Sequence, residues 1–165
     1  MDNGLSTNIE ELYDKFLKLN SSEMTKTLKK ALVEGARELK NTTISNLDSS
    51  ILVKGTSMDA LHSGVQIGKV KGEYGEDLEV KVNIMGNKLV HGGRDRRLMW
   101  LENGTDDRYT KTWKGKELNK PRYTGRMTGK FFFKSANDAV IPRLDQIYAS
   151  TIDKTIDKIN KTKIS

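Results

Sequence analysis

The chain contains no cysteine among its 165 residues. Disulfide bonds and thiol catalysis are therefore excluded, and synthesis in a cytoplasm is consistent with this composition. Only two histidines are present, His62 and His91, whereas a structural zinc site normally needs four nitrogen or sulfur ligands. We therefore expect no metal site and no cofactor.

Long apolar runs are also missing. No stretch approaches the roughly 18 consecutive apolar residues of a transmembrane helix, and residues 1–4 lack the basic start of a secretory signal. We expect no membrane contact. Hydrophobic residues make up only 35% of the chain and charged residues 31%, but the apolar residues follow regular patterns, so general disorder is not expected. The length suits a single domain, 1–165.

Two helices are predicted near the N-terminus, the second longer than the first. Apolar residues recur at helical spacing over 9–19 and again over 24–47. A capping box, in which two side chains cap each other's backbone amides, precedes each pattern. The two capping boxes are Thr7 with Glu10 and Asn20 with Glu23.

The middle of the chain changes to a period of two residues. Residues 78–84 alternate apolar and polar side chains, which predicts a half-buried antiparallel strand. A similar pattern begins at Val65, and residues 72–75 predict a turn, so 64–85 is expected to form a β-hairpin. Residues 96–101 fit either a strand or a helical turn.

The C-terminal part returns to helical spacing. Apolar residues from Leu144 to Ile159 predict a long helix, with Pro142 in its first turn or at a kink. The predicted fold is therefore α+β, with a small antiparallel sheet packed against two N-terminal helices and one long C-terminal helix. Residues 106–128 are expected to form a long basic loop or β-arm inserted into this domain.

Positive charge is concentrated in one segment. Residues 108–134 contain nine Lys or Arg against the single Glu117, a net charge of +8, whereas the whole chain carries +7. Interleaved aromatic residues are typical of nucleic-acid-binding segments. A solvated loop that aids solubility, or a loop that docks on an acidic neighbouring subunit, explains the charge equally well. The candidates for contact with DNA or a neighbouring subunit are Arg108, Lys111, Trp113, Lys114, Lys116, Lys120, Arg122 and Arg126.

A hexapeptide before this segment has a plain architectural interpretation. Its sequence is Trp100-Leu101-Glu102-Asn103-Gly104-Thr105. Gly104 predicts a turn, because glycine adopts a positive φ readily. Trp100 and Leu101 would pack inside, and Glu102 would accept hydrogen bonds from turn amides or from an arginine such as Arg126.

Three consecutive phenylalanines, Phe131 to Phe133, are short enough for a strand. Phe132 would then face one side and its neighbours the other. Because a large exposed apolar patch usually marks an interface, we favour a role in both core and interface over a role in the core alone.

Catalytic signatures are weak. His91 in a glycine-rich turn is more typical of a solvated residue than of a general base. The adjacent carboxylates Asp106 and Asp107 are more typical of pairing with Arg108 or Lys111 than of cation binding. No Ser-His-Asp order, phosphate-binding loop or paired-carboxylate spacing stands out, so we expect that the chain is not an enzyme.

The hexapeptide and a later segment together resemble a known signature. The later segment is Thr128-Gly129-Lys130-Phe131-Phe132-Phe133-Lys134-Ser135-Ala136. The pair resembles the tail-completion or minor tail component family of tailed bacteriophages, which carries an aromatic-x-Glu-x-Gly-Thr turn and then a Phe-x-Arg/Lys-x-Ala segment. Phe131 and Ser135 stand where that family usually has proline. The matching residues are Trp100, Glu102, Gly104 and Thr105 in the turn, and Phe132, Lys134 and Ala136 in the later segment.

The resemblance implies an α+β virion protein that works through interfaces. It implies a homo-oligomeric ring, six-fold in symmetry, stacked between the head connector and the tail tube, and made in the cytoplasm of a bacterial host. Contacts near Phe131, Phe132, Phe133 and Ala136 would form the ring. The alternative, drawn from the charge alone, is a small cytoplasmic nucleic-acid-binding protein that uses the basic aromatic arm 108–134.

Overall fold

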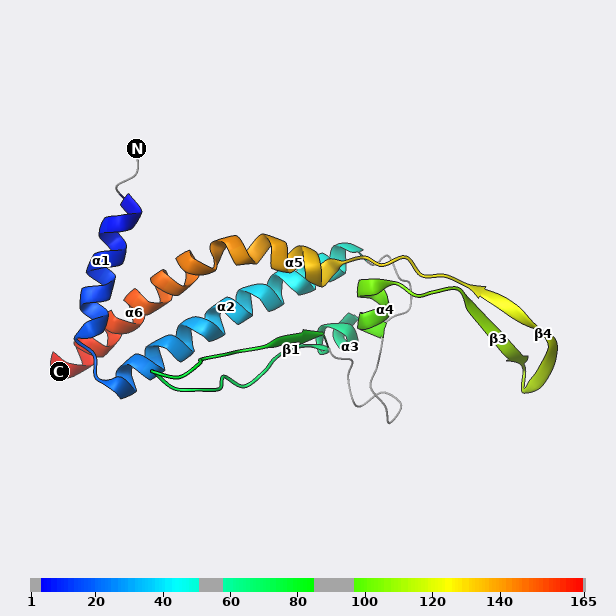
Figure 1. The fold of residues 1–165 in the computed structure, drawn as a ribbon, viewed down its shortest axis with the longest axis horizontal. Helices are drawn as coiled ribbons and strands as arrows, with labels where there is room; N and C mark the ends of the chain where they lie inside the picture. The colour runs from blue at the N-terminus through cyan, green and yellow to red at the C-terminus, as the bar shows by residue number, and fades with distance from the viewer. Residues whose placement is uncertain (1–3, 51–57, 85–96, 165) are drawn as a thin grey trace. The chain divides into compact units, whose positions relative to one another are not determined.

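The computed structural model describes residues 4–50, 58–84 and 97–164, and it has a mixed α+β fold (Figure 1). The chain divides into two compact units. Unit 1 comprises residues 1–42, 67–83 and 137–165, and unit 2 comprises residues 43–66 and 84–136. The expectation of a single domain stays a prediction.

Two N-terminal helices are present, as predicted. Helix α1 spans Gly4–Leu17 and helix α2 spans Ser21–Ser50. The predicted capping box at Thr7 is wrong, because α1 already begins at Gly4 and amides inside a helix bond to the preceding turn. The second box is confirmed: the Asn20 N–H donates to the Glu23 carboxylate (3.1 Å), and the Glu23 N–H donates to the Asn20 side chain (3.0 Å).

Unit 1 is built on α1, α2 and the C-terminal helix α6, Leu144–Ile164, which confirms the predicted long last helix. The Lys15 ammonium reaches from α1 to Asp153 of α6 at 3.3 Å. The buried residues Leu19, Met24 and Ile156 form a core cluster against which further apolar side chains pack. These are Leu12, Phe16, Ile152 and Ile159.

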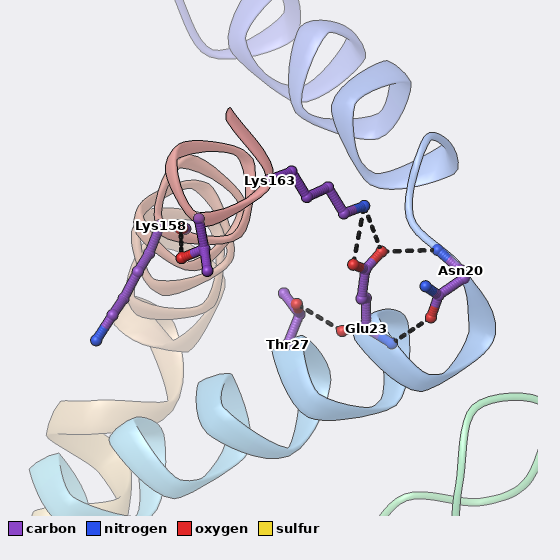
Figure 2. A network of polar contacts seen from close by, with 6 residues as sticks. Asn20, Glu23, Thr27, Lys158 and Lys163 are labelled. Atoms are coloured by element: carbon purple, nitrogen blue, oxygen red, sulfur yellow. Dashed lines mark hydrogen bonds and ion pairs between the residues drawn. The ribbon is translucent and has the colours of Figure 1, made fainter. Parts of the chain in front are cut away.

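Helices α2 and α6 lie side by side in opposite directions (Figure 1). At one end the Lys163 ammonium bridges both carboxylate oxygens of Glu23, at 2.8 and 2.9 Å (Figure 2). Lys163 and the Asn20 amide hold the pKa of Glu23 below its ordinary value. At the other end Arg143 reaches Glu38 at 3.4 Å. The two ion pairs therefore join α2 to the C-terminal end of α6 and to the residue that precedes α6.

A glycine allows the close approach of these two helices. A Cβ atom on Gly35 of α2 would lie 2.6 Å from Cε1 of Tyr148 on α6. Burial at this contact raises the pKa of the Tyr148 hydroxyl. Ionisation of the phenol is therefore less favourable in the folded chain than in the unfolded chain.

The predicted β-hairpin is present but its ladder is short. Strands β1, Val65–Ile67, and β2, Val82–Ile84, form a two-stranded sheet, and helix α3, Met58–His62, precedes it. Beyond the strands, the Gly68 N–H donates to the Lys81 carbonyl at 2.7 Å, and the bridge Lys71–Glu79 continues the pairing. The expected alternation is visible in the segment before β2, where Glu79 is exposed and its apolar neighbours Leu78 and Val80 are half-buried.

The remaining elements resolve the ambiguous segments. Helix α4, Arg97–Asn103, shows that the described part of 96–101 is helical. Strands β3, Arg108–Trp113, and β4, Lys116–Gly125, pair antiparallel, so the basic segment is a β-arm. Helix α5, Phe132–Val140, begins within the phenylalanine run, so the strand predicted there is wrong. The 3₁₀ helix η1, Ile141–Arg143, contains Pro142 and leads into α6.

Candidate interaction site

The two motifs that the sequence singled out meet in unit 2. The end of α4 lies against the segment that precedes α5, and backbone hydrogen bonds join them. The last carbonyl groups of α4 have no hydrogen-bond donors within the helix, and this segment supplies donors for them. The bonds run from the Lys130 N–H to the Leu101 carbonyl (2.7 Å), from the Phe131 N–H to the Glu102 carbonyl (3.1 Å) and from the Thr105 N–H to the Met127 carbonyl (2.9 Å).

The Glu102 side chain caps helix α5 from another part of the chain. Its buried carboxylate accepts the backbone N–H of Phe133 at 2.8 Å and that of Lys134 at 3.0 Å. Phe131 is the N-cap residue, since its carbonyl accepts the Ser135 N–H at 2.9 Å, but a phenyl ring cannot cap amides. A carboxylate at a helix N-terminus also interacts favourably with the helix dipole.

The prediction that Glu102 binds backbone amides is therefore confirmed in kind, although the donors belong to α5 and are neither turn amides nor Arg126. This link explains why a strand does not form at 131–133. Local sequence gave no signal for it, because the capping carboxylate lies 31 residues before Phe133. Capping rules compare residues only about three positions apart.

Two glycines permit the contact between the motifs. Gly104 ends α4 with φ +79°, as the Asn103-Gly104 pattern predicts, and its N–H donates to the Trp100 carbonyl at 2.8 Å. A Cβ atom on Gly104 would lie 2.6 Å from the Met127 carbonyl oxygen, and one on Gly129 would lie 2.7 Å from the Glu102 carbonyl oxygen. Both obstacles are backbone atoms, so neither position accommodates a side chain without a shift of the chain.

The prediction that Trp100 packs inside is wrong. Its side chain is 43% exposed, whereas Leu98 is buried and Leu101 is half-buried. The reason is that the hexapeptide is mostly helix, and residues four apart share a helix face. Leu98 and Glu102 therefore occupy the buried face of α4.

The phenylalanine run divides between core and surface. Phe132 and Ala136 are fully buried and lie four residues apart on one face of α5. The Asn46 side chain donates to the Phe132 carbonyl at 3.2 Å, which fixes the start of the helix. Phe131 is 50% exposed, and Phe133 is half-buried. The run thus supplies both a core anchor and an exposed ring.

An open hollow of about 630 Å³ lies beside the joined motifs. We call it the motif hollow, and its walls include Trp100, Thr105, Arg126, Met127 and Phe131. Two partly exposed aromatic rings border it, together with one cation. Such a lining suits an apolar side chain from a partner with polar groups around it.

The β-arm carries the other predicted contact residues, and no residue of either strand is buried. In its ladder Tyr109 pairs with Tyr123, and their rings lie 5.4 Å apart. The Arg122 guanidinium lies 5.0 Å from the centre of the Trp113 ring. Of the remaining candidates, Arg108 and Lys111 lie in β3, Lys116 and Lys120 in β4, Lys114 in the turn at φ +49°, and Arg126 just after β4.

The residues considered for catalysis or metal binding have ordinary partners where they are described. His62 pairs with Asp48 at 2.6 Å, and Asp107 accepts the Tyr123 hydroxyl at 3.3 Å in place of the expected arginine or lysine. His91 lies outside the described residues. Within the described ranges, no three His, Cys, Asp or Glu side chains gather as metal ligands would. No described helix combines the length and apolar character needed to cross a membrane.

Comparisons with known proteins add no relative. The chain matches no protein-family model, no curated protein and no solved structure.

Proposed function

We propose that this chain is a structural virion-assembly protein of a tailed bacteriophage, which completes the tail or neck by joining the head connector to the tail. It works without catalysis, through a ring of copies of itself, six-fold in symmetry. It is made in the cytoplasm of the bacterial host and is located in the neck of the virion. The sequence resemblance names this class, and the exposed Phe131 beside the joined motifs is the observation that carries the proposal.

Local structure alone does not account for a phenylalanine at position 131. Its φ is +50°, a left-handed conformation in which glycine, asparagine and aspartate are favoured. It is also the N-cap of α5, where serine, threonine, aspartate and asparagine are preferred. Its ring is half exposed, so little burial compensates. A contact with another molecule explains why an aromatic residue stands there.

The Glu102 carboxylate allows an exposed aromatic residue to occupy the N-cap position of α5. Because the carboxylate binds the amides of Phe133 and Lys134, the side chain at position 131 does not need to cap the helix. The exposed Trp100 borders the same hollow. Tryptophan and other aromatic residues are enriched at the centres of protein interfaces. The motif hollow and its two rings therefore suit a contact between neighbouring copies or with the connector.

Inactivation of the gene in the virus that encodes it tests this function. We expect DNA-filled heads and separate tails in electron micrographs, and we expect an intact copy supplied from a plasmid to restore joined particles. Antibodies against the purified chain should label the neck of complete virions. Infectious, joined particles in the absence of the protein would contradict the proposal.

A further inference from the structure

The β-arm, residues 108–125, carries positive charge that the described residues do not neutralise. It contains six Lys or Arg against the single Glu117. Among the residues that the structure describes, no carboxylate lies within salt-bridge distance of its lysines. These are Lys111, Lys114, Lys116 and Lys120, all exposed. Small counterions balance such charges in solution, and their release to bulk drives binding to a phosphate backbone.

The arm is open to solvent along both strands and carries three aromatic rings. Tyr123 pairs with Tyr109, and their rings are in contact. The Arg122 guanidinium lies over the Trp113 ring. The three rings are each more than half exposed. A two-stranded ribbon of this kind has the cross-section that the major groove of duplex DNA admits.

The aromatic rings favour nucleic acid over an acidic protein as the partner. A surface of carboxylates would neutralise the lysines, but carboxylates do not stack on aromatic rings as nucleobases do. Nucleic acid supplies phosphates and planar bases together, and exposed aromatic side chains with arginine are its usual stacking partners. We propose that the β-arm binds nucleic acid independently of sequence, through phosphate contacts from its lysines and contacts from its aromatic rings. This inference goes beyond ring assembly and does not depend on it.

Titration of the full-length protein with labelled duplex and single-stranded DNA tests the inference. If the four lysines contact phosphates, duplex affinity should fall roughly 100-fold between about 50 and about 200 mM salt. Binding to either form with this salt dependence supports the proposal. Failure to bind both forms at about 50 mM salt overturns it.

A matched pair of variants assigns the binding to the arm. The arm variant combines Lys111→Gln, Lys114→Gln, Lys116→Gln and Lys120→Gln. The control variant removes the same charge from exposed positions of unit 1 through Lys18→Gln, Lys30→Gln, Lys154→Gln and Lys158→Gln. We expect the log–log salt slope to shrink by about three to four in the arm variant only. Equal loss in both variants would mean that net charge, and not the arm, binds DNA.

The aromatic contribution separates nucleic acid from an acidic protein partner. Trp113→Ala should weaken binding to single-stranded DNA roughly tenfold, while circular dichroism reports an unchanged helix content. Polyglutamate should compete poorly at equal charge. Equal competition by polyglutamate, with no effect of Trp113→Ala, would replace nucleic acid by an acidic protein surface and overturn the proposal.

Discussion

The carboxylate of Glu102 accepts the backbone N–H of Phe133 at 2.8 Å, across 31 residues of sequence. This bond gives α5 the cap that its own N-cap residue, Phe131, cannot provide. It also joins the segments 100–105 and 128–136 into one structural element. The two motifs are separated in the chain because the β-arm is inserted between them, although they contact each other in the structure.

Removal of this carboxylate should destabilise unit 2. We expect Glu102→Ala to lower the free energy of unfolding by about 1–3 kcal/mol, because it leaves two helix amides without acceptors. Glu102→Gln should cost less, since its amide oxygen still accepts one bond. Guanidinium titrations measure both, with the exposed Glu117→Gln as control. If Glu102→Ala unfolded at the same denaturant concentration as the wild type, the cap would have no energetic role.

Two glycines with nearly the same φ allow the cost of backbone strain to be distinguished from the cost of a steric clash. Gly104 has φ +79° and Gly115 has φ +77°, but only a Cβ at Gly104 meets other atoms within 4 Å. Alanine at either position incurs a left-handed penalty of about 1–2 kcal/mol. Gly104→Ala should cost at least about 1 kcal/mol more, because the Met127 carbonyl must move. Equal thermal shifts for the two variants would show that the motifs are not packed as closely as described.

The contacts of the Glu23 carboxylate with Lys163 and the Asn20 amide predict that the folded chain loses stability in acid. Folding lowers the pKa of Glu23 from its ordinary value of 4.5, chiefly through the Lys163 hydrogen bond and then through the Asn20 amide. The unfolded chain therefore binds this proton more readily than the folded chain. The stabilisation is complete above pH 4.5 and is lost as the pH falls through the lowered folded-state pKa.

Unfolding free energies of the wild type and Glu23→Gln, measured between about pH 2 and about pH 7, check this prediction. The difference between them should be largest near neutral pH and should shrink in acid. Glu76→Gln, which removes an exposed carboxylate elsewhere in unit 1, is the control. A difference that stays constant with pH would exclude ionised Glu23 as its source.

Local patterns predicted local structure well. The Asn20–Glu23 capping box, the alternation around Glu79 and the apolar stripe of α6 each depend on neighbours a few residues apart, and each was confirmed. The failures depend on distant contacts. Phe132 lies in a helix because Glu102 caps it, and Trp100 is exposed because Leu98 and Glu102 take the buried face of α4.

For the candidate site, too, features visible in the local sequence were predicted and features that depend on the fold were not. Composition alone identified the basic aromatic arm, and the structure gave it a strand register and a contact between Arg122 and Trp113. The left-handed backbone of Phe131 had no signal in the sequence, because a run of phenylalanines does not normally adopt it. The contact between the two motifs could not be predicted either, because only folding brings these distant segments together.

Replacement of Phe131 by asparagine tests whether the exposed ring takes part in assembly, because it removes the ring and suits the left-handed backbone. We expect Phe131→Asn to raise the free energy of unfolding by up to about 1 kcal/mol, since asparagine tolerates a positive φ better than phenylalanine does. The matched control is Ile141→Asn, which removes a similarly exposed apolar side chain, 59% against 50%, from unit 1.

The decisive readout is the fraction of joined particles when each variant complements the inactivated gene. Ile141→Asn should restore joined virions, whereas Phe131→Asn, although stably folded, should leave filled heads and free tails. Joined virions in normal number with Phe131→Asn would contradict the proposed role of Phe131, because the exposed ring would then have no part in assembly.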